Sequence, residues 1–217
     1  MIIEKVASKI APGRTPFFAG VHVVKALKTI EAEGPIGRAK LSKRLGLGGG
    51  TIRTLAKHLE TERLIKISRT GILLSDSGKK LFFELGSRIS KEIEVRESSL
   101  TVGSCNAAIL VKDAANLVRH GLEQRDAAIK IGALGATTLV FSRGKLDMPG
   151  VKYDAFRSDP AVRVELISKL QPQENDVIIL GSANDKLTAE YGAIAAALET
   201  LEVKVRIKPR PKEDNGV

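Results

Sequence analysis

A run of glycines between two short amphipathic segments places the strongest constraint on how this chain can fold. Residues 38–45 carry Leu41 and Leu45 at a helical spacing, and a glycine-rich stretch at residues 46–50 follows directly. Glycine allows positive φ angles, so this stretch can turn tightly between two closely set helices. A second helical pattern runs from about residue 51 to residue 62, with apolar residues at i, i+3, i+4 and i+7. The two patterns predict a helix-turn-helix unit.

The segments on either side of this unit carry equally regular patterns. Residues 17–33 place apolar side chains on one face of a helix, which Gly34-Pro35 ends. Residues 64–75 contain two apolar runs joined by Arg69-Thr70-Gly71, which predicts a β-hairpin with Arg69 at its tip. A further helix is predicted to start at Ser75 or Asp76 and to continue toward residue 99. Its apolar stripe is Leu81, Phe82, Leu85 and Ile89.

The positive charge of the chain is concentrated in the same region. Residues 1–98 contain 19 lysines and arginines against 10 acidic residues, whereas residues 99–217 contain 16 against 15. The formal net charge of +10 therefore falls almost entirely on the first segment. A strong positive field on one small domain is typical of a surface that binds nucleic-acid phosphates.

The combined pattern resembles the winged helix-turn-helix domain of archaeal and other prokaryotic transcriptional regulators. It is carried by the stretch GPIGRAKLSKRLGLGGGTIRTLAKHLETERLIKISRTGILLSDSGKKL, and the resemblance covers about residues 17–90. The resemblance implies an α+β domain that binds double-stranded DNA. The whole chain is also similar to archaeal winged-helix proteins whose second domain has no assigned chemistry. Because winged helices also serve as RNA-binding and protein-interaction modules, an RNA-binding or chromatin-associated protein is kept as an alternative.

The helix after the glycine-rich turn is expected to contact DNA. Arginine can bind guanine edges through two hydrogen bonds, lysine neutralises phosphate, and threonine contacts phosphate or a thymine methyl group. Any amphipathic helix exposes a charged face, but the preceding turn and the following hairpin favour DNA contact here. With the neighbouring helix and the hairpin, the predicted DNA-binding residues are Arg38, Lys40, Lys43, Thr51, Arg53, Thr54, Lys57, His58, Lys66 and Arg69.

After Leu100 the composition changes, and Ala, Gly, Val and Ile dominate. Strands are predicted at residues 107–111, 136–142, 177–180 and 203–207, and helices at 121–131, 159–170 and 184–201. The helix at 121–131 is expected to turn Leu122, Ala128 and Ile129 inward. Alternating strands and helices are typical of an α/β domain with a mostly parallel or mixed sheet. The expected domains are residues 1–95 and 99–207, with a disordered tail at residues 208–217.

Ligands of parallel α/β sheets bind beyond the carboxyl ends of the strands. Polar residues follow three predicted strands, and the loop at residues 181–185 offers backbone N–H groups at a helix start. A small polar or anionic effector is therefore expected at Arg125, Asp126, Arg143, Ser182 and Asn184. Ordinary turn and capping chemistry is the alternative for the same residues.

Catalysis requires a base, a nucleophile or a metal held in a site. The chain has three histidines and one cysteine, Cys105, and no His/Asp/Glu spacing typical of a metal site. We therefore predict no catalytic residue, metal or cofactor. An enzyme in the second domain, docked to nucleic acid by its winged helix, is the alternative.

No apolar stretch approaches the roughly 20 residues that a membrane-spanning helix needs. Pro12, Gly13 and Arg14 interrupt any apolar run that a signal peptide would need. We therefore predict a cytoplasmic transcriptional regulator that binds duplex DNA and makes no membrane contact. Its second domain senses a ligand, dimerises, or does both. A homodimer would read two half-sites. The candidate surfaces are the apolar second domain and the row Leu85, Ile89 and Ile93, which can equally pack within its own domain.

Overall fold

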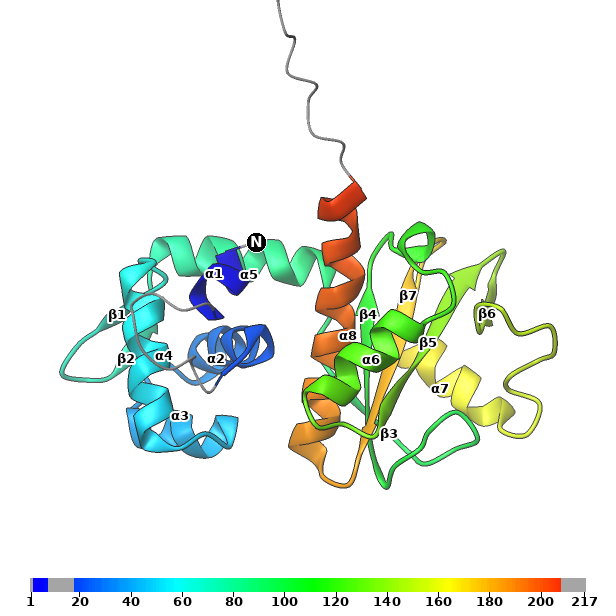
Figure 1. Ribbon diagram of the computed structural model, residues 1–217, viewed down its shortest axis with the longest axis horizontal. Helices are drawn as coiled ribbons and strands as arrows, with labels where there is room; N and C mark the ends of the chain where they lie inside the picture. Colours follow the sequence, from blue (N-terminus) through cyan, green and yellow to red (C-terminus); the bar gives the residue numbers. More distant parts are fainter. Residues whose placement is uncertain (1, 8–17, 208–217) are drawn as a thin grey trace, which may run out of the picture.

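The computed structural model describes residues 2–7 and 18–207 (Figure 1). The predicted tail at residues 208–217 and Phe17 lie outside the described residues. The N-terminal region is defined here as residues 2–7 and 18–88, and the C-terminal region as residues 89–207. The N-terminal region contains α1 (Ile2–Ala7), α2 (Gly20–Glu33), α3 (Arg38–Leu45), α4 (Gly49–Thr61), β1 (Ile65–Ile67), β2 (Ile72–Leu74) and α5 (Asp76–Arg88).

Local signals in the sequence set the boundaries of these elements. Gly46 takes a φ of 60° and ends α3, and its N–H group donates to the carbonyl oxygen of Ser42. Ser75 caps α5, because its hydroxyl accepts a hydrogen bond of 3.0 Å from the backbone N–H of Gly78. The hairpin of β1 and β2 is antiparallel. The hairpin and the helices α2, α3 and α4 are thus confirmed, with α4 starting two residues earlier than expected, and α5 is confirmed at its start. The short helix α1 has no counterpart in the sequence analysis.

The C-terminal region is built on a five-stranded sheet. Its elements are β3 (Ile93–Val95), β4 (Cys105–Val111), the 3₁₀ turn η1 (Ala115–Leu117), α6 (Leu122–Lys130), β5 (Gly135–Ser142), β6 (Lys145–Asp147), α7 (Pro160–Leu170), β7 (Val177–Ala183) and α8 (Lys186–Ile207). The strand order is β3-β4-β7-β5-β6, and every neighbouring pair is antiparallel. Helices α6 and α8 cover one face, and α7 covers the other (Figure 1).

The prediction of a mostly parallel or mixed sheet is therefore wrong. Strands β4 and β5 do run in the same direction, because each is antiparallel to β7. They are not neighbours, since β7 lies between them and pairs Ile179 with both Ile109 and Thr138. A strand-helix-strand sequence fixes the relative direction of two strands, but it leaves room for a third strand to be inserted between them.

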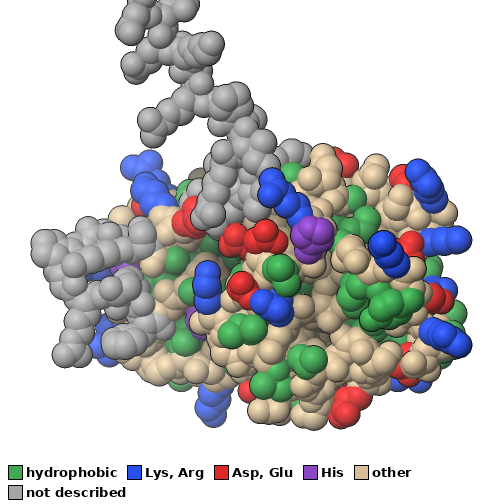
Figure 2. All heavy atoms as spheres, turned by 45° about the vertical axis from the view of Figure 1, so that its right-hand side comes forward, with side chains coloured by type: hydrophobic (Ala, Val, Ile, Leu, Met, Phe, Trp, Pro, Cys, Tyr) green, Lys and Arg blue, Asp and Glu red, His purple; other side chains and the backbone are tan. Residues whose placement is uncertain are grey.

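Three further predictions in this region are wrong. Helix α5 ends at Arg88, and residues 93–95 form a strand paired with β4 instead of continuing the helix. Residues 203–207 belong to α8, because no glycine or proline separates them from the helix before them. In α6, Leu122 and Ile129 are exposed, whereas Gln124 and Ala128 face inward with Gly121. Figure 2 shows that hydrophobic side chains reach the surface of the C-terminal region among charged ones.

Helix α8 lies between the sheet and the N-terminal region (Figure 1) and packs closely on the sheet through small residues. A Cβ atom built on Gly181 of β7 would lie 2.4 Å from the carbonyl oxygen of Ala189 and 2.4 Å from the nitrogen of Ala193. A Cβ atom on Gly192 would lie 2.7 Å from Cβ of Ala133, just beyond α6. One buried apolar cluster extends from the N-terminal helices across α8 to the sheet. The two regions therefore share a core.

We expect the replacement Gly181→Ala to destabilise the protein by about 1–3 kcal/mol, because backbone atoms of α8 must move to admit the methyl group. Gly86→Ala is the matched control. Gly86 lies exposed within α5, and a Cβ atom there meets nothing within 4 Å. That replacement should stabilise the protein by about 0.5–1 kcal/mol. Urea denaturation of both variants measures the difference, and equal midpoints would contradict the packing argument.

Candidate nucleic-acid interface

Helix α4 presents one polar face to solvent. Arg53, Thr54 and Lys57 are exposed, and Thr51 is half-buried. The opposite face, which includes Ile52 and Leu55, is buried against the other N-terminal helices. Arg53 lies at the fifth residue of the helix, near the end that a recognition helix directs to base edges. These four side chains therefore lie where the helical period places them.

His58 is an exception, and its prediction as a DNA-binding residue is wrong. Its side chain is only 8% exposed. The ring Nδ1 atom lies 2.8 Å from the carbonyl oxygen of Val6, and the ring packs edge-on against Phe18. Helix α1, which no sequence pattern predicted, covers this part of α4. His58 therefore ties α1 to α4.

The basic residues of α3 extend the exposed surface next to α4. Arg38, Lys40 and Lys43 are all exposed. Lys40 donates to Glu33 at the end of α2 over 2.8 Å, and Arg44 contacts the same carboxylate over 2.8 Å. The hydrogen bond from Lys40, assisted by Arg44, holds the pKa of Glu33 below its usual value. Part of the charge of α3 is thus neutralised within the chain.

The hairpin projects Lys66 and Arg69 into solvent. Lys66 lies 3.9 Å from Asp76, and both side chains are exposed, so this pair constrains Lys66 weakly. The turn is closed by a hydrogen bond from the backbone N–H of Ser68 to the carbonyl oxygen of Gly71. Gly71 has a φ of 138° and lies against the backbone of Ile36, where a Cβ atom would be 2.9 Å from a carbonyl oxygen. The hairpin is therefore anchored to the segment that precedes α3.

Three exposed glycines, Gly48, Gly49 and Gly50, open α4. A Cβ atom on any of them would meet nothing within 4 Å, and none has a positive φ angle. The fold requires glycine at Gly46 for its φ angle, but it does not require glycine at these three positions. No side chain caps this end of the helix. The first turn of α4 thus presents bare backbone that another molecule can approach closely, which suits a phosphate at a helix N-terminus.

The turn before α4 rests on α8. The hydroxyl of Tyr191 donates to the carbonyl oxygen of Leu45 over 2.8 Å. A Cβ atom on Gly46 would lie 2.8 Å from Leu187. The ring of His22 on α2 packs against the ring of Tyr191 at a centroid distance of 4.6 Å, with the two ring planes tilted by 55°. Burial raises the pKa of Tyr191, so its hydroxyl stays protonated and able to donate. The C-terminal region therefore contacts the helix-turn-helix unit at its turn.

The structure does not bring the five predicted effector residues together. Arg125 pairs with Asp126 on the outer face of α6. Arg143 is exposed at the turn after β5, and its backbone N–H donates to Glu174. Ser182 is buried near the end of β7, where its hydroxyl accepts from the N–H of Val102 over 3.4 Å, and the exposed Asn184 follows that strand. Because β5 and β7 are antiparallel, Arg143 lies at the edge of the sheet opposite to Ser182 and Asn184.

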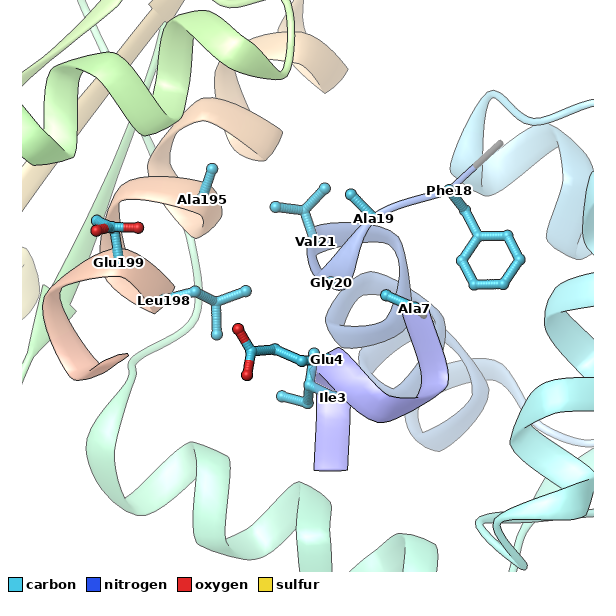
Figure 3. A pocket seen from close by; sticks show the side chains of 10 residues that line it. All are labelled: Ile3, Glu4, Ala7, Phe18, Ala19, Gly20, Val21, Ala195, Leu198 and Glu199. Carbon is cyan, nitrogen blue, oxygen red and sulfur yellow. The ribbon is translucent and has the colours of Figure 1, made fainter. Parts of the chain in front are cut away.

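Two hollows lie where α8 meets the N-terminal helices. The smaller, of about 380 Å³, lies between α1, α2 and α8 (Figure 3). Its lining includes Ile3, Val21 and Leu198 and the carboxylates of Glu4 and Glu199. Figure 3 shows that these side chains come from all three helices.

The larger hollow is a cleft of about 890 Å³ between α2, α5 and α8. Lys28 lines it and donates to Glu92 over 3.0 Å and to the carbonyl oxygen of Ser90. Burial lowers the pKa of Lys28, against the opposing effect of Glu92. Nearby, Lys25 pairs with Glu190 of α8 over 2.5 Å. Both lysines therefore link α2 to the C-terminal region.

Comparisons with known proteins agree with this geometry. Residues 23–89 match the family model described as "CggR N-terminal DNA binding domain". The N-terminal region is thus similar to a DNA-binding domain. Residues 102–201 match a family described as "Domain of unknown function (DUF4443)". The predicted resemblance to winged-helix regulators with an uncharacterised second domain is confirmed.

A hypothetical protein from Pyrococcus horikoshii OT3, among the solved structures, is 29% identical in sequence. The match covers 83% of this chain and 98% of that chain, with a TM-score of 0.62. Curated proteins give no match. Among the described residues, no helix is long and apolar enough to cross a membrane, and no three His, Cys, Asp or Glu side chains gather to hold a metal ion.

We expect the stability of the protein to fall as the pH drops from about 7.5 to about 5.5, partly through His22. Burial lowers the pKa of His22 below its ordinary value of 6.5. The unfolded chain therefore binds a proton near that pH while the folded chain does not, which favours unfolding at the lower pH. Thermal melts of the wild type and of His22→Gln measure the effect, and the variant should show the shallower dependence. His120→Gln, at an exposed position, is the control. Equal slopes for wild type and His22→Gln would refute this role.

Proposed function

We propose that this chain is a transcriptional regulator that binds duplex DNA through α4. The exposed face of α4, beginning in the bare backbone of Gly48–Gly50, carries the proposal. Arg53 is assigned to base edges, Thr54 to bases or phosphate, and Lys57 to phosphate. The remaining proposed contacts are Arg38, Lys40 and Lys43 on α3, Thr51 on α4, and Lys66 and Arg69 on the hairpin. A cytoplasmic location belongs to the same proposal.

In this proposal, the C-terminal region positions α4. The support is the contact between α8 and the turn before α4, where Tyr191 holds the carbonyl oxygen of Leu45 over 2.8 Å. Residues 1–95 are proposed as the DNA-binding unit, and residues 99–207 as the regulatory unit. However, β3 at residues 93–95 already pairs with the sheet of the second unit. Binding of a small polar or anionic effector stays a prediction. The five residues expected to bind it do not share one site.

A homodimer also belongs to the proposal, but not through the row Leu85, Ile89 and Ile93. Leu85 and Ile89 are buried in the shared core of the chain. Ile93 lies in β3 and packs against the cluster on the α7 face of the sheet. These side chains pack against other residues of their own chain, so a second copy must bind at another surface.

We expect the purified chain to bind duplex DNA with an affinity that falls steeply with salt. If about four to six phosphates are neutralised, log K should decrease against log[salt] with a slope of about −4 to −5. Arg53→Ala should cost about 1–3 kcal/mol of discrimination between preferred and scrambled sequences. Lys57→Ala should weaken binding to both sequences alike. Selection of bound DNA from a random pool, followed by anisotropy titrations, tests this. A flat salt response would overturn DNA binding, and equal losses for Arg53→Ala on both sequences would reassign Arg53 to phosphate.

The variant Gly50→Ala separates DNA contact from folding. A methyl group at Gly50 meets no protein atom within 4 Å, and alanine favours helix by about 1 kcal/mol over glycine. Stability should therefore hold or rise. DNA affinity should fall by about tenfold, equivalent to about 1.4 kcal/mol, because the methyl group keeps a phosphate from the backbone N–H groups. Gly86→Ala on α5 controls for a general effect of a glycine-to-alanine change. Unchanged affinity in Gly50→Ala would show that the first turn of α4 does not approach DNA.

A further inference from the structure

The outer face of α6 is apolar at both ends and charged in the middle. Leu122 and Ile129 are 51% and 47% exposed, and their spacing of seven residues places them two turns apart on one side of the helix. Arg125 and Asp126 lie between them on the same side and are also exposed. The guanidinium of Arg125 donates to the Asp126 carboxylate over 2.9 Å. Within its own chain, this side of α6 thus presents two bulky apolar residues to solvent.

These four residues form a self-complementary pattern. When two identical helices pack antiparallel about a two-fold axis, each contact occurs twice, with the residue numbers exchanged. An axis that passes between positions 125 and 126 sets Leu122 of one copy opposite Ile129 of the other. The same axis sets Arg125 opposite Asp126 of the other copy. Apolar residues therefore meet apolar residues, and each positive charge meets a negative charge.

Further apolar residues lie next to this strip. Val102 is 65% exposed, and both Val102 and Arg125 lie within 4 Å of the position of a Cβ atom on Gly135. Leu134, the residue before Gly135, is also exposed. These side chains widen the strip. Exposed apolar side chains that gather on one face are typical of an interaction site.

From this arrangement, we infer that the outer face of α6 binds a second copy of this chain as a two-fold dimer interface. The second copy is favoured as the partner because both its apolar residues and its charges match the strip. A different partner would have to reproduce, in reverse order, a pattern that this chain already carries. The α6 strip comprises Leu122, Arg125, Asp126 and Ile129 at its centre, with Val102 and Leu134 beside it.

The size of the strip predicts a modest affinity. A helix of nine residues is about 13 Å long, so α6 alone buries less than the roughly 1,200–2,000 Å² of a stable interface. We therefore expect a dimer that dissociates in the micromolar range. The inference rests on the homodimer of the proposed function and names its surface. It does not rest on DNA binding, and its test contains no DNA, so dimerisation and DNA binding can fail separately.

The test is sedimentation equilibrium of the full chain between about 1 and about 200 µM. The wild type should shift from the monomer mass of 23.3 kDa toward twice that value. Leu122→Asp should stay monomeric over the whole range. Val164→Asp is the matched control, because Val164 is 67% exposed on α7, which covers the opposite face of the sheet. That variant should dimerise like the wild type, and circular dichroism checks that both variants are folded.

Charge reversal identifies the partner strip. Arg125→Asp gives a strip with two negative charges, and Asp126→Arg gives a strip with two positive charges. Each variant alone should repel its own copy and stay monomeric. An equimolar mixture should associate, because each strip then meets one of opposite sign. A monomeric wild type at the highest concentration would overturn the inference. A dimer that persists in Leu122→Asp and in both charge variants would also overturn it.

Discussion

The packing of α8 against the sheet and the N-terminal region at once is the constraint on which the structure depends. On one side, α8 approaches β7 and α6 so closely that Gly181 and Gly192 leave no room for a Cβ atom. On the other side, Tyr191 and Glu190 reach α3 and α2. Small residues allow the first contact, and polar side chains on the same helix orient the second. One apolar cluster passes through both contacts. Neither the N-terminal helices nor the sheet can therefore shift on α8 without exposing buried side chains.

The insertion of β7 between β4 and β5 has a consequence for ligand binding. In a parallel sheet, the polar residues after each strand would meet at one edge. Here, the residues after β4 and β5 lie at one edge, and those after β7 lie at the other. The loop after β7 instead begins α8, where Asp185 accepts a hydrogen bond from the N–H of Thr188. That bond also holds the pKa of Asp185 below its usual value. This loop therefore acts as a helix cap, which was the alternative considered for it.

Local sequence signals predicted local structure well, and contacts between distant segments were missed. Gly46 and Ser75 each act within a few residues, and both end or start a helix as expected. The exposed face of α4 also followed from its period, apart from His58, which α1 covers. The order of the strands depends on where β7 enters the sheet, and no local sequence pattern predicts the position of β7. Periodicity misplaced Leu122 and Ile129 for a different reason, because α6 has apolar residues on two sides and only one of them is buried.

The two proposed surfaces are connected through α8. Helix α6 packs against α8 through Ala128, as does Ala133 just beyond α6, and α8 in turn contacts the turn before α4 through Tyr191. In a dimer built on α6, the separation of the two α4 helices is therefore set by the contact between α8 and the N-terminal region. Dimeric helix-turn-helix proteins read half-sites one helical turn of DNA apart, or multiples of it, so the separation decides which operators fit. His22, Tyr191 and the ion pair of Lys25 with Glu190 lie at that contact. In such a dimer, these side chains would help to set the half-site spacing, although they lie away from the proposed DNA-binding surface.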